Sequence, residues 1–122
     1  MNILHVDDSP EICQLYADIL SLGNNCLTSV NEGRQGLELA LKNDYDLILL
    51  DICMPKYSGM EFIYDIKAQR PSELKKIIIV SVLELTESHK AELLKLGIHS
   101  IEEKLSTIQR LETIKKNLFL TK

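Results

Sequence analysis

The chain has 122 residues, of which 45% are hydrophobic and 26% are charged, and its formal net charge at pH 7 is -4. This length suits one compact domain, and this composition is ordinary for a globular protein. The mild negative charge disfavours direct nucleic-acid binding, which needs a basic surface. No apolar run reaches the roughly 18 residues of a membrane span, so we expect no membrane partner.

The three cysteines, Cys13, Cys26 and Cys53, are far apart and include no CxxC pair. This spacing argues against a disulfide framework and against a zinc site. The first residues lack the charged start and the long apolar stretch of a signal peptide. We therefore expect the protein to be located in a reducing cytoplasm.

Short apolar runs alternate with segments of helical periodicity along the chain. The runs predict strands at residues 3–6, 26–30, 47–50 and 77–82, with a weaker strand at 98–101. Several of these runs are nearly continuous in Val, Ile and Leu. Such continuity is typical of parallel strands that are covered on both faces.

The segments between the runs predict five helices. The first begins at Ser9, a side-chain cap, with Pro10 at the first helical position, and Gly23 supplies its left-handed stop. The others are expected at 33–42, after Ser58, from near Thr86 to Gly97, and from near Ser106. The fourth should bury Leu93 and Leu94, and the fifth carries an apolar stripe of Ile108, Leu111, Ile114 and Leu118.

Five strands alternating with five helices predict an α/β fold of (βα)5 type. Right-handed crossovers turn such a chain into a doubly wound parallel sheet with helices on both faces. The fifth helix uses up the chain, so we expect one domain.

Polar residues stand where the strands end. Asp7 and Asp8 follow the first strand, Asp51 the third, Ser81 closes the fourth, and Lys104 follows the fifth. Ligands of doubly wound sheets bind at this edge. Crowded carboxylates repel, and a hard cation such as Mg²⁺ removes that penalty. An aspartate can also attack phosphorus to give an aspartyl phosphate, so these residues indicate phosphoryl transfer.

With these residues in this order, the chain resembles the receiver domain of bacterial two-component response regulators along essentially its whole length. The matching stretches are ILHVDDSP, YDLILLDICMPKYSGMEFI, KKIIIVSV and IEEK. The resemblance implies a flavodoxin-like, five-stranded parallel sheet with strand order 2-1-3-4-5. It also implies a single receiver domain over residues 1–122, similar to the chemotaxis response regulators.

The resemblance further implies a role for each polar residue. Asp51 would be the phosphoacceptor. Asp8, Asp51 and the backbone carbonyl of Cys53 would ligate Mg²⁺ (or Mn²⁺), with Asp7 acting through water. The phosphoryl group would be bound by Ser81 and Lys104.

The implied partners are proteins of a signalling relay. The phosphoryl donor would be a phosphohistidine on a sensor histidine kinase or a histidine phosphotransfer protein. The output would be a changed surface near the fourth helix, fifth strand and fifth helix, which binds a downstream protein. We expect a monomer or weak dimer that acts as a switch and not as an enzyme, with only self-directed phosphotransfer and autodephosphorylation.

Four residues depart from the family pattern. Leu105 replaces a proline that usually follows a cis bond, and because a non-proline cis bond costs ~2.5–4 kcal/mol we predict a trans bond. Ile101 replaces a switching Tyr or Phe, and Val82 replaces a smaller residue and narrows access to the phosphate. Cys53 lacks the amide often found at its position. We therefore expect ordinary acceptance chemistry with a non-standard switch.

Two other functions stay open. The departures at Val82, Ile101 and Leu105 are compatible with a degenerate receiver that binds proteins without phosphorylation. A Mg²⁺-dependent phosphatase of the haloacid dehalogenase type also uses an aspartate at a strand end, then Ser or Thr, then Lys. Such enzymes place Asp-x-Asp on the first strand, whereas Asp7 and Asp8 are adjacent.

Overall fold

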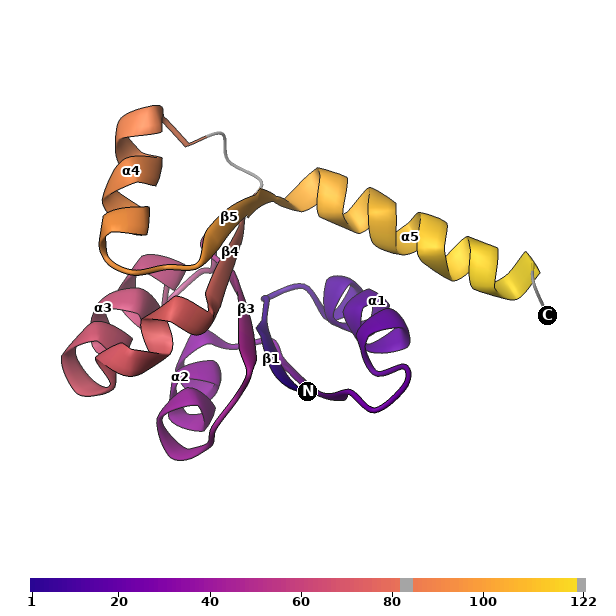
Figure 1. Cartoon of the computed structure of the whole chain (residues 1–122), viewed down its shortest axis with the longest axis horizontal. Helices are drawn as coiled ribbons and strands as arrows, with labels where there is room; N and C mark the ends of the chain where they lie inside the picture. The colour runs from indigo at the N-terminus through magenta and orange to yellow at the C-terminus, as the bar shows by residue number, and fades with distance from the viewer. Residues whose placement is uncertain (82–84, 121–122) are drawn as a thin grey trace.

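A computed structural model describes residues 1–81 and 85–120 (Figure 1). Its five parallel strands form one sheet in the order β2-β1-β3-β4-β5, which confirms the predicted topology. The strands are β1 (Asn2–Val6), β2 (Cys26–Val30), β3 (Leu47–Asp51), β4 (Ile77–Ser81) and β5 (Ser100–Glu103). The helices are α1 (Pro10–Leu20), α2 (Gly33–Lys42), α3 (Gly59–Gln69), α4 (Glu87–Lys95) and α5 (Lys104–Leu120), with a 3-10 helix, η1 (Pro71–Lys76), before β4.

Three helices begin at hydroxyl side chains, as predicted. Ser9 accepts a hydrogen bond from a backbone N–H at the start of α1, Ser58 does so for α3, and Thr86 does so for α4. Each cap satisfies an N–H group that has no partner within the helix and contributes about 1 kcal/mol. These local interactions fix where each chain segment leaves the sheet.

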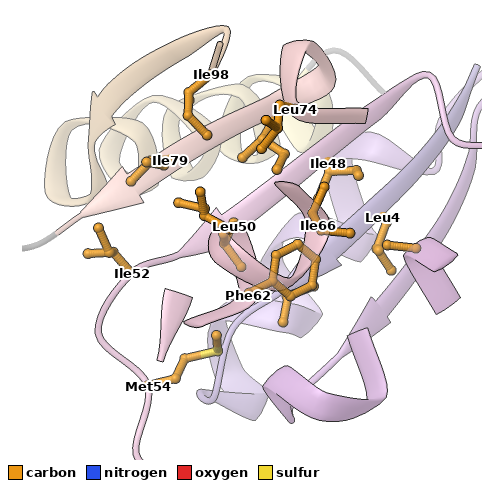
Figure 2. Close-up of a cluster of buried hydrophobic side chains, with 14 of the residues drawn as sticks. Leu4, Ile48, Leu50, Ile52, Met54, Phe62, Ile66, Leu74, Ile79 and Ile98 are labelled. Atoms are coloured by element: carbon orange, nitrogen blue, oxygen red, sulfur yellow. The ribbon is translucent and has the colours of Figure 1, made fainter. Parts of the chain in front are cut away.

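Helices cover both faces of the sheet (Figure 1), and an apolar cluster is buried on each face. The larger core lies on the side of α2, α3 and α4, where Leu4, Leu50 and Phe62 are fully buried (Figure 2). The smaller core lies under α1 and α5 and includes Ile3, Tyr16, Ile19, Leu49 and Leu111. Because strand residues alternate between faces, Asp7 is expected on the same face as Ile3, and Asp51 on the same face as Leu49. This is the face of the smaller core.

The strand register places the polar strand ends at one edge of the sheet. Val6 pairs with Leu50, so Asp7 and Asp51 both follow directly from paired residues. Ser81 pairs with Glu103, so Lys104 follows at the end of β5. All these residues therefore reach the carboxyl edge of the sheet.

Several expectations about the last two strand–helix units were wrong. β5 covers Ser100–Glu103 and not residues 98–101, and α5 begins at Lys104, two residues before Ser106. η1, which begins at Pro71, was not predicted at all. It follows α3 almost directly, as a proline at the first position of a new turn allows.

Two residues expected in the core are exposed. Leu94 is 48% exposed because its neighbour Leu93 takes the inward position on α4, and successive helical residues diverge by about 100°. Ile114 is 46% exposed and belongs to α5, a helix that extends beyond the sheet (Figure 1). No cis peptide bond occurs in the described residues, which confirms the trans bond before Leu105.

None of the helices in the described ranges is long and apolar enough to cross a bilayer.

Gly59 gives a direct test of packing beneath the site. A Cβ atom there would lie 2.5 Å from the Ile52 Cα and 2.7 Å from the Asp51 carbonyl oxygen, which are backbone atoms that cannot move aside. We expect Gly59→Ala to lower the free energy of unfolding by about 3 kcal/mol in urea denaturation. Gly23→Ala is the comparison, since that site is open and its φ of 71° costs only about 1 kcal/mol. An equal loss in both variants would contradict this packing.

Candidate functional site

The centre of the polar edge is the ammonium of Lys104. Its Nζ lies 2.7 Å from Asp7 Oδ2 and 3.1 Å from Asp51 Oδ2, and all three side chains are buried. Lys104 is the first residue of α5, whereas the carboxylates come from the ends of β1 and β3. One cation therefore joins three separate parts of the chain.

Backbone groups hold the second oxygen of each buried carboxylate. The Ser9 N–H donates to Asp7 Oδ1 at 3.0 Å, and the Cys53 N–H donates to Asp51 Oδ1 at 3.1 Å. Both donors lie two residues after the aspartate, in the turn that leaves the strand. The two carboxylates are thus oriented by the loops as well as by Lys104.

Asp8 adds a third carboxylate, which is exposed. One oxygen from each of Asp7, Asp8 and Asp51 lies within 4.8 Å of the others. Three negative charges surround one ammonium, so the cluster has excess negative charge. The structure thus brings together the two aspartates of β1, the aspartate of β3 and Lys104, as expected.

Burial and the excess charge both act on the pKa of Asp51. Burial and the nearby Asp7 charge raise the pKa of Asp51 to about 6, although the Cys53 N–H and Lys104 act in the opposite direction. Burial alone would lower the pKa of Lys104, but its hydrogen bond to Asp7 and the charges of both aspartates raise it overall. The repulsion predicted for crowded carboxylates is therefore present.

The remaining expected residues lie around this cluster. Ser81 is buried at the end of β4, and Cys53 is exposed beside Asp51. Burial and the Asp51 charge raise the pKa of the Cys53 thiol, which agrees with a poorly reactive cysteine. Ile101 is partly buried against the larger core, and Leu105 is 58% exposed. Val82 lies outside the described residues.

A side-chain cluster that sequence reasoning missed supports the loop after β3. The Tyr57 hydroxyl donates to the carboxylate of Asp65, and the Arg34 guanidinium lies 4.7 Å from the Tyr57 ring centroid. A cavity of about 390 Å³, lined by Asp8, Arg34, Lys56 and Tyr57 among others, opens here beside the site. Residue spacing carried no signal for it, because Arg34 and Tyr57 meet only in the folded chain.

A second missed cluster lies beneath the carboxylates. His5 is buried and stacks on Tyr16, with ring centroids 4.0 Å apart, and its Nδ1 lies 2.8 Å from Ser29 Oγ. Burial and the Lys104 charge lower the pKa of His5 to about 3, so the imidazole is neutral at pH 7. Residue spacing carried no signal for this stack, because His5 and Tyr16 meet only in the folded chain.

Comparison with known proteins agrees with this geometry. The Escherichia coli (strain K12) transcriptional regulatory protein HprR is 34% identical over 70 residues, which are 57% of this chain but only 31% of that protein. A chemotaxis protein CheY homolog of Campylobacter jejuni is 31% identical over 117 residues, covering 92% of this chain and 87% of that protein. The chain thus spans about a third of the transcriptional regulator and most of the chemotaxis protein.

The fold has solved relatives. The Vibrio cholerae chemotaxis protein CheY4 superposes with a TM-score of 0.74 at 27% identity, covering 90% of this chain and 97% of that one. The family model described as a response regulator receiver domain matches residues 3–116. With this match, and with an acidic cluster at the carboxyl edge of a 2-1-3-4-5 sheet, the chain belongs to the response regulator receiver domains of two-component signalling.

Proposed function

We propose that Asp51 accepts a phosphoryl group from a phosphohistidine on a sensor histidine kinase or a histidine phosphotransfer protein. The observation that carries this proposal is the buried Lys104 ammonium within 3.1 Å of Asp51 Oδ2. The ammonium lies close enough to pair with the carboxylate first and with the oxygens of an incoming phosphoryl group afterwards. Residues 1–122 would act as one receiver domain.

The chemistry of this step needs little from the protein except orientation and charge. An Asp51 carboxylate oxygen attacks phosphorus, an O–P bond forms, the N–P bond of the donor breaks, and the electron pair leaves with the imidazole. The Cys53 N–H holds the other carboxylate oxygen and so fixes which oxygen attacks. Lys104 and Ser81 would bind the transferred oxygens.

The donor set fits a hard divalent cation. Asp8, Asp51 and the Cys53 carbonyl would hold Mg²⁺ (or Mn²⁺), and Asp7 would act through water. Three carboxylate oxygens within 4.8 Å and the raised pKa of Asp51 both support a cation there. When bound, the cation supplies charge neutralisation for the phosphoryl oxygens.

The output surface would be formed by α4, β5 and α5. Leu94, Leu105 and Ile114 expose large apolar side chains on the two helices, which suits a surface that binds another protein. The phosphorylated domain would present this surface differently to its target. Ile101 gives β5 no aromatic ring to rotate, so the change would be carried by other residues.

Asp51→Asn tests the acceptor assignment. We expect intact-mass spectrometry to show one added phosphoryl group on the wild type after treatment with Mg²⁺ and acetyl phosphate, and none on Asp51→Asn, because an amide is not nucleophilic toward phosphorus. Asp46→Asn, at the amino end of β3, should be modified like the wild type.

Two other outcomes would point elsewhere. An unmodified wild type, with both acetyl phosphate and phosphorylated kinase, would favour the degenerate receiver that binds proteins without phosphorylation. Continuous release of phosphate from small esters over many turnovers would favour the phosphatase.

The raised pKa of Asp51 predicts a pH-dependent gain in stability on neutralising this residue. Its folded-state pKa of about 6 exceeds its ordinary value of 3.8, so the folded state loses stability as the pH rises through this interval. In urea denaturation with a chelator present, the free energy of unfolding of Asp51→Asn should exceed that of the wild type by at most about 3 kcal/mol at pH 8. At pH 4 the two free energies should be nearly equal.

Glu112→Gln, at an exposed carboxylate on α5, is the control and should show no such pH dependence. Added Mg²⁺ should stabilise the wild type more than Asp51→Asn, since only the wild type keeps all three carboxylates. A wild type that is the more stable of the two at pH 8 would show that Lys104 already compensates the Asp51 charge.

A further inference from the structure

The Tyr16 hydroxyl stands out among the buried polar groups. Among the buried side-chain nitrogen and oxygen atoms of the described ranges, this hydroxyl oxygen lacks a hydrogen-bond partner. Tyr16 is only 1% exposed. Such a hydroxyl costs free energy that phenylalanine at the same position would not cost, so its presence calls for a role beyond packing.

The Tyr16 ring lies directly beneath the site. It stacks on His5 with planes 3° apart, and it shares the smaller core with Leu49. His5 and Leu49 each precede a site aspartate by two residues, which places the ring roughly 7 Å below Asp7 and Asp51 along their strands.

The geometry of α1 indicates that the hydroxyl lies on the side of these aspartates. α1 begins just after Asp8, at the carboxyl edge, and side chains on a helix lean toward its N-terminus. Burial, and then the charges of Asp7 and Asp51, raise the pKa of Tyr16 to about 12. The phenol therefore keeps its proton at neutral pH and can act as a hydrogen-bond donor.

In the described structure Asp7 does not need this donor. Lys104 Nζ lies 2.7 Å from Asp7 Oδ2, and the Ser9 N–H serves Oδ1. A phosphoryl group on Asp51 would carry its charge further out, and Lys104 would follow it. Asp7, which is buried, would then lose its closest cation, and a buried carboxylate that loses a donor is costly.

We infer that Tyr16 is a positioning residue for phosphoryl transfer, whose hydroxyl donates to Asp7 when Lys104 turns from Asp7 to the phosphoryl group on Asp51. Tyr16 thereby lowers the cost of releasing Lys104. This inference rests on the proposed function and assigns a residue to it outside the polar strand ends.

Tyr16→Phe tests the inference, because it keeps the ring and its stack on His5 and removes only the hydroxyl. We expect phosphorylation of Asp51 by acetyl phosphate with Mg²⁺, followed by intact mass over time, to be roughly tenfold slower. Urea denaturation should show the variant to be at least as stable as the wild type. Tyr45→Phe, at a buried tyrosine before β3, is the matched control and should keep the wild-type rate.

The outcomes separate this inference from the proposed function. If the wild type is phosphorylated and Tyr16→Phe is phosphorylated at the same rate, the inference is overturned and the proposed function is kept. An unmodified wild type would overturn the proposed function and the inference with it.

The route through Asp7 has its own test. In an Asp7→Asn background the charge that needs the donor is gone, so adding Tyr16→Phe should change the rate by less than about twofold. A full effect of Tyr16→Phe in that background would contradict the role assigned to Asp7.

Discussion

The Lys104 ammonium between Asp7 and Asp51 is the interaction on which the rest of the site depends. It lies at 2.7 and 3.1 Å from carboxylates of two different strands, and it begins the helix that follows a third. Removing the ammonium would leave two buried carboxylates without their cation, and an uncompensated buried charge typically costs 3–5 kcal/mol. The ends of β1 and β3 and the start of α5 therefore meet at one ammonium, so a change of charge at Asp51 would act on the first residue of α5.

This arrangement is maintained by the apolar cores and is unfavourable for stability by itself. The pKa of Asp51 is raised although a cation and a backbone N–H face its carboxylate, so burial and repulsion from Asp7 outweigh both. Two apolar layers on a regular parallel sheet supply the free energy that holds these groups together. Retained strain of this kind is characteristic of functional sites, where binding a ligand relieves it.

The features that the sequence predicted correctly are those that depend on local interactions. Ser9, Ser58 and Thr86 cap the helices that follow them, so α1, α3 and α4 start where expected. The apolar runs located the strands, and parallel pairing brought Asp7, Asp8, Asp51 and Lys104 to one edge. Leu93 is buried and Leu94 is exposed because of the way α4 is rotated about its own axis, and periodicity over nine residues leaves that rotation undetermined. The pairing of Arg34 with Tyr57, and the burial of the Tyr16 hydroxyl, arise only from tertiary packing.

The carboxylates around Lys104 determine whether its position at the start of a helix is electrostatically favourable. A cation at the first turn of a helix is opposed by the helix dipole, whose N-terminus is positive. Here α5 begins at Lys104 itself, so the ammonium and the positive end of the helix both lie at the acidic edge. The carboxylates of Asp7 and Asp51 offset this unfavourable placement. The Lys104 ammonium and the N-terminus of α5 therefore both act on the same acidic cluster. Under the proposed function, charge added at Asp51 would act first on the start of α5, the helix that carries the exposed Leu105 and Ile114. Leu105 directly adjoins Lys104, so under the proposed function a shift of the ammonium toward a phosphoryl group would reach the first turn of α5 even without an aromatic switch in β5.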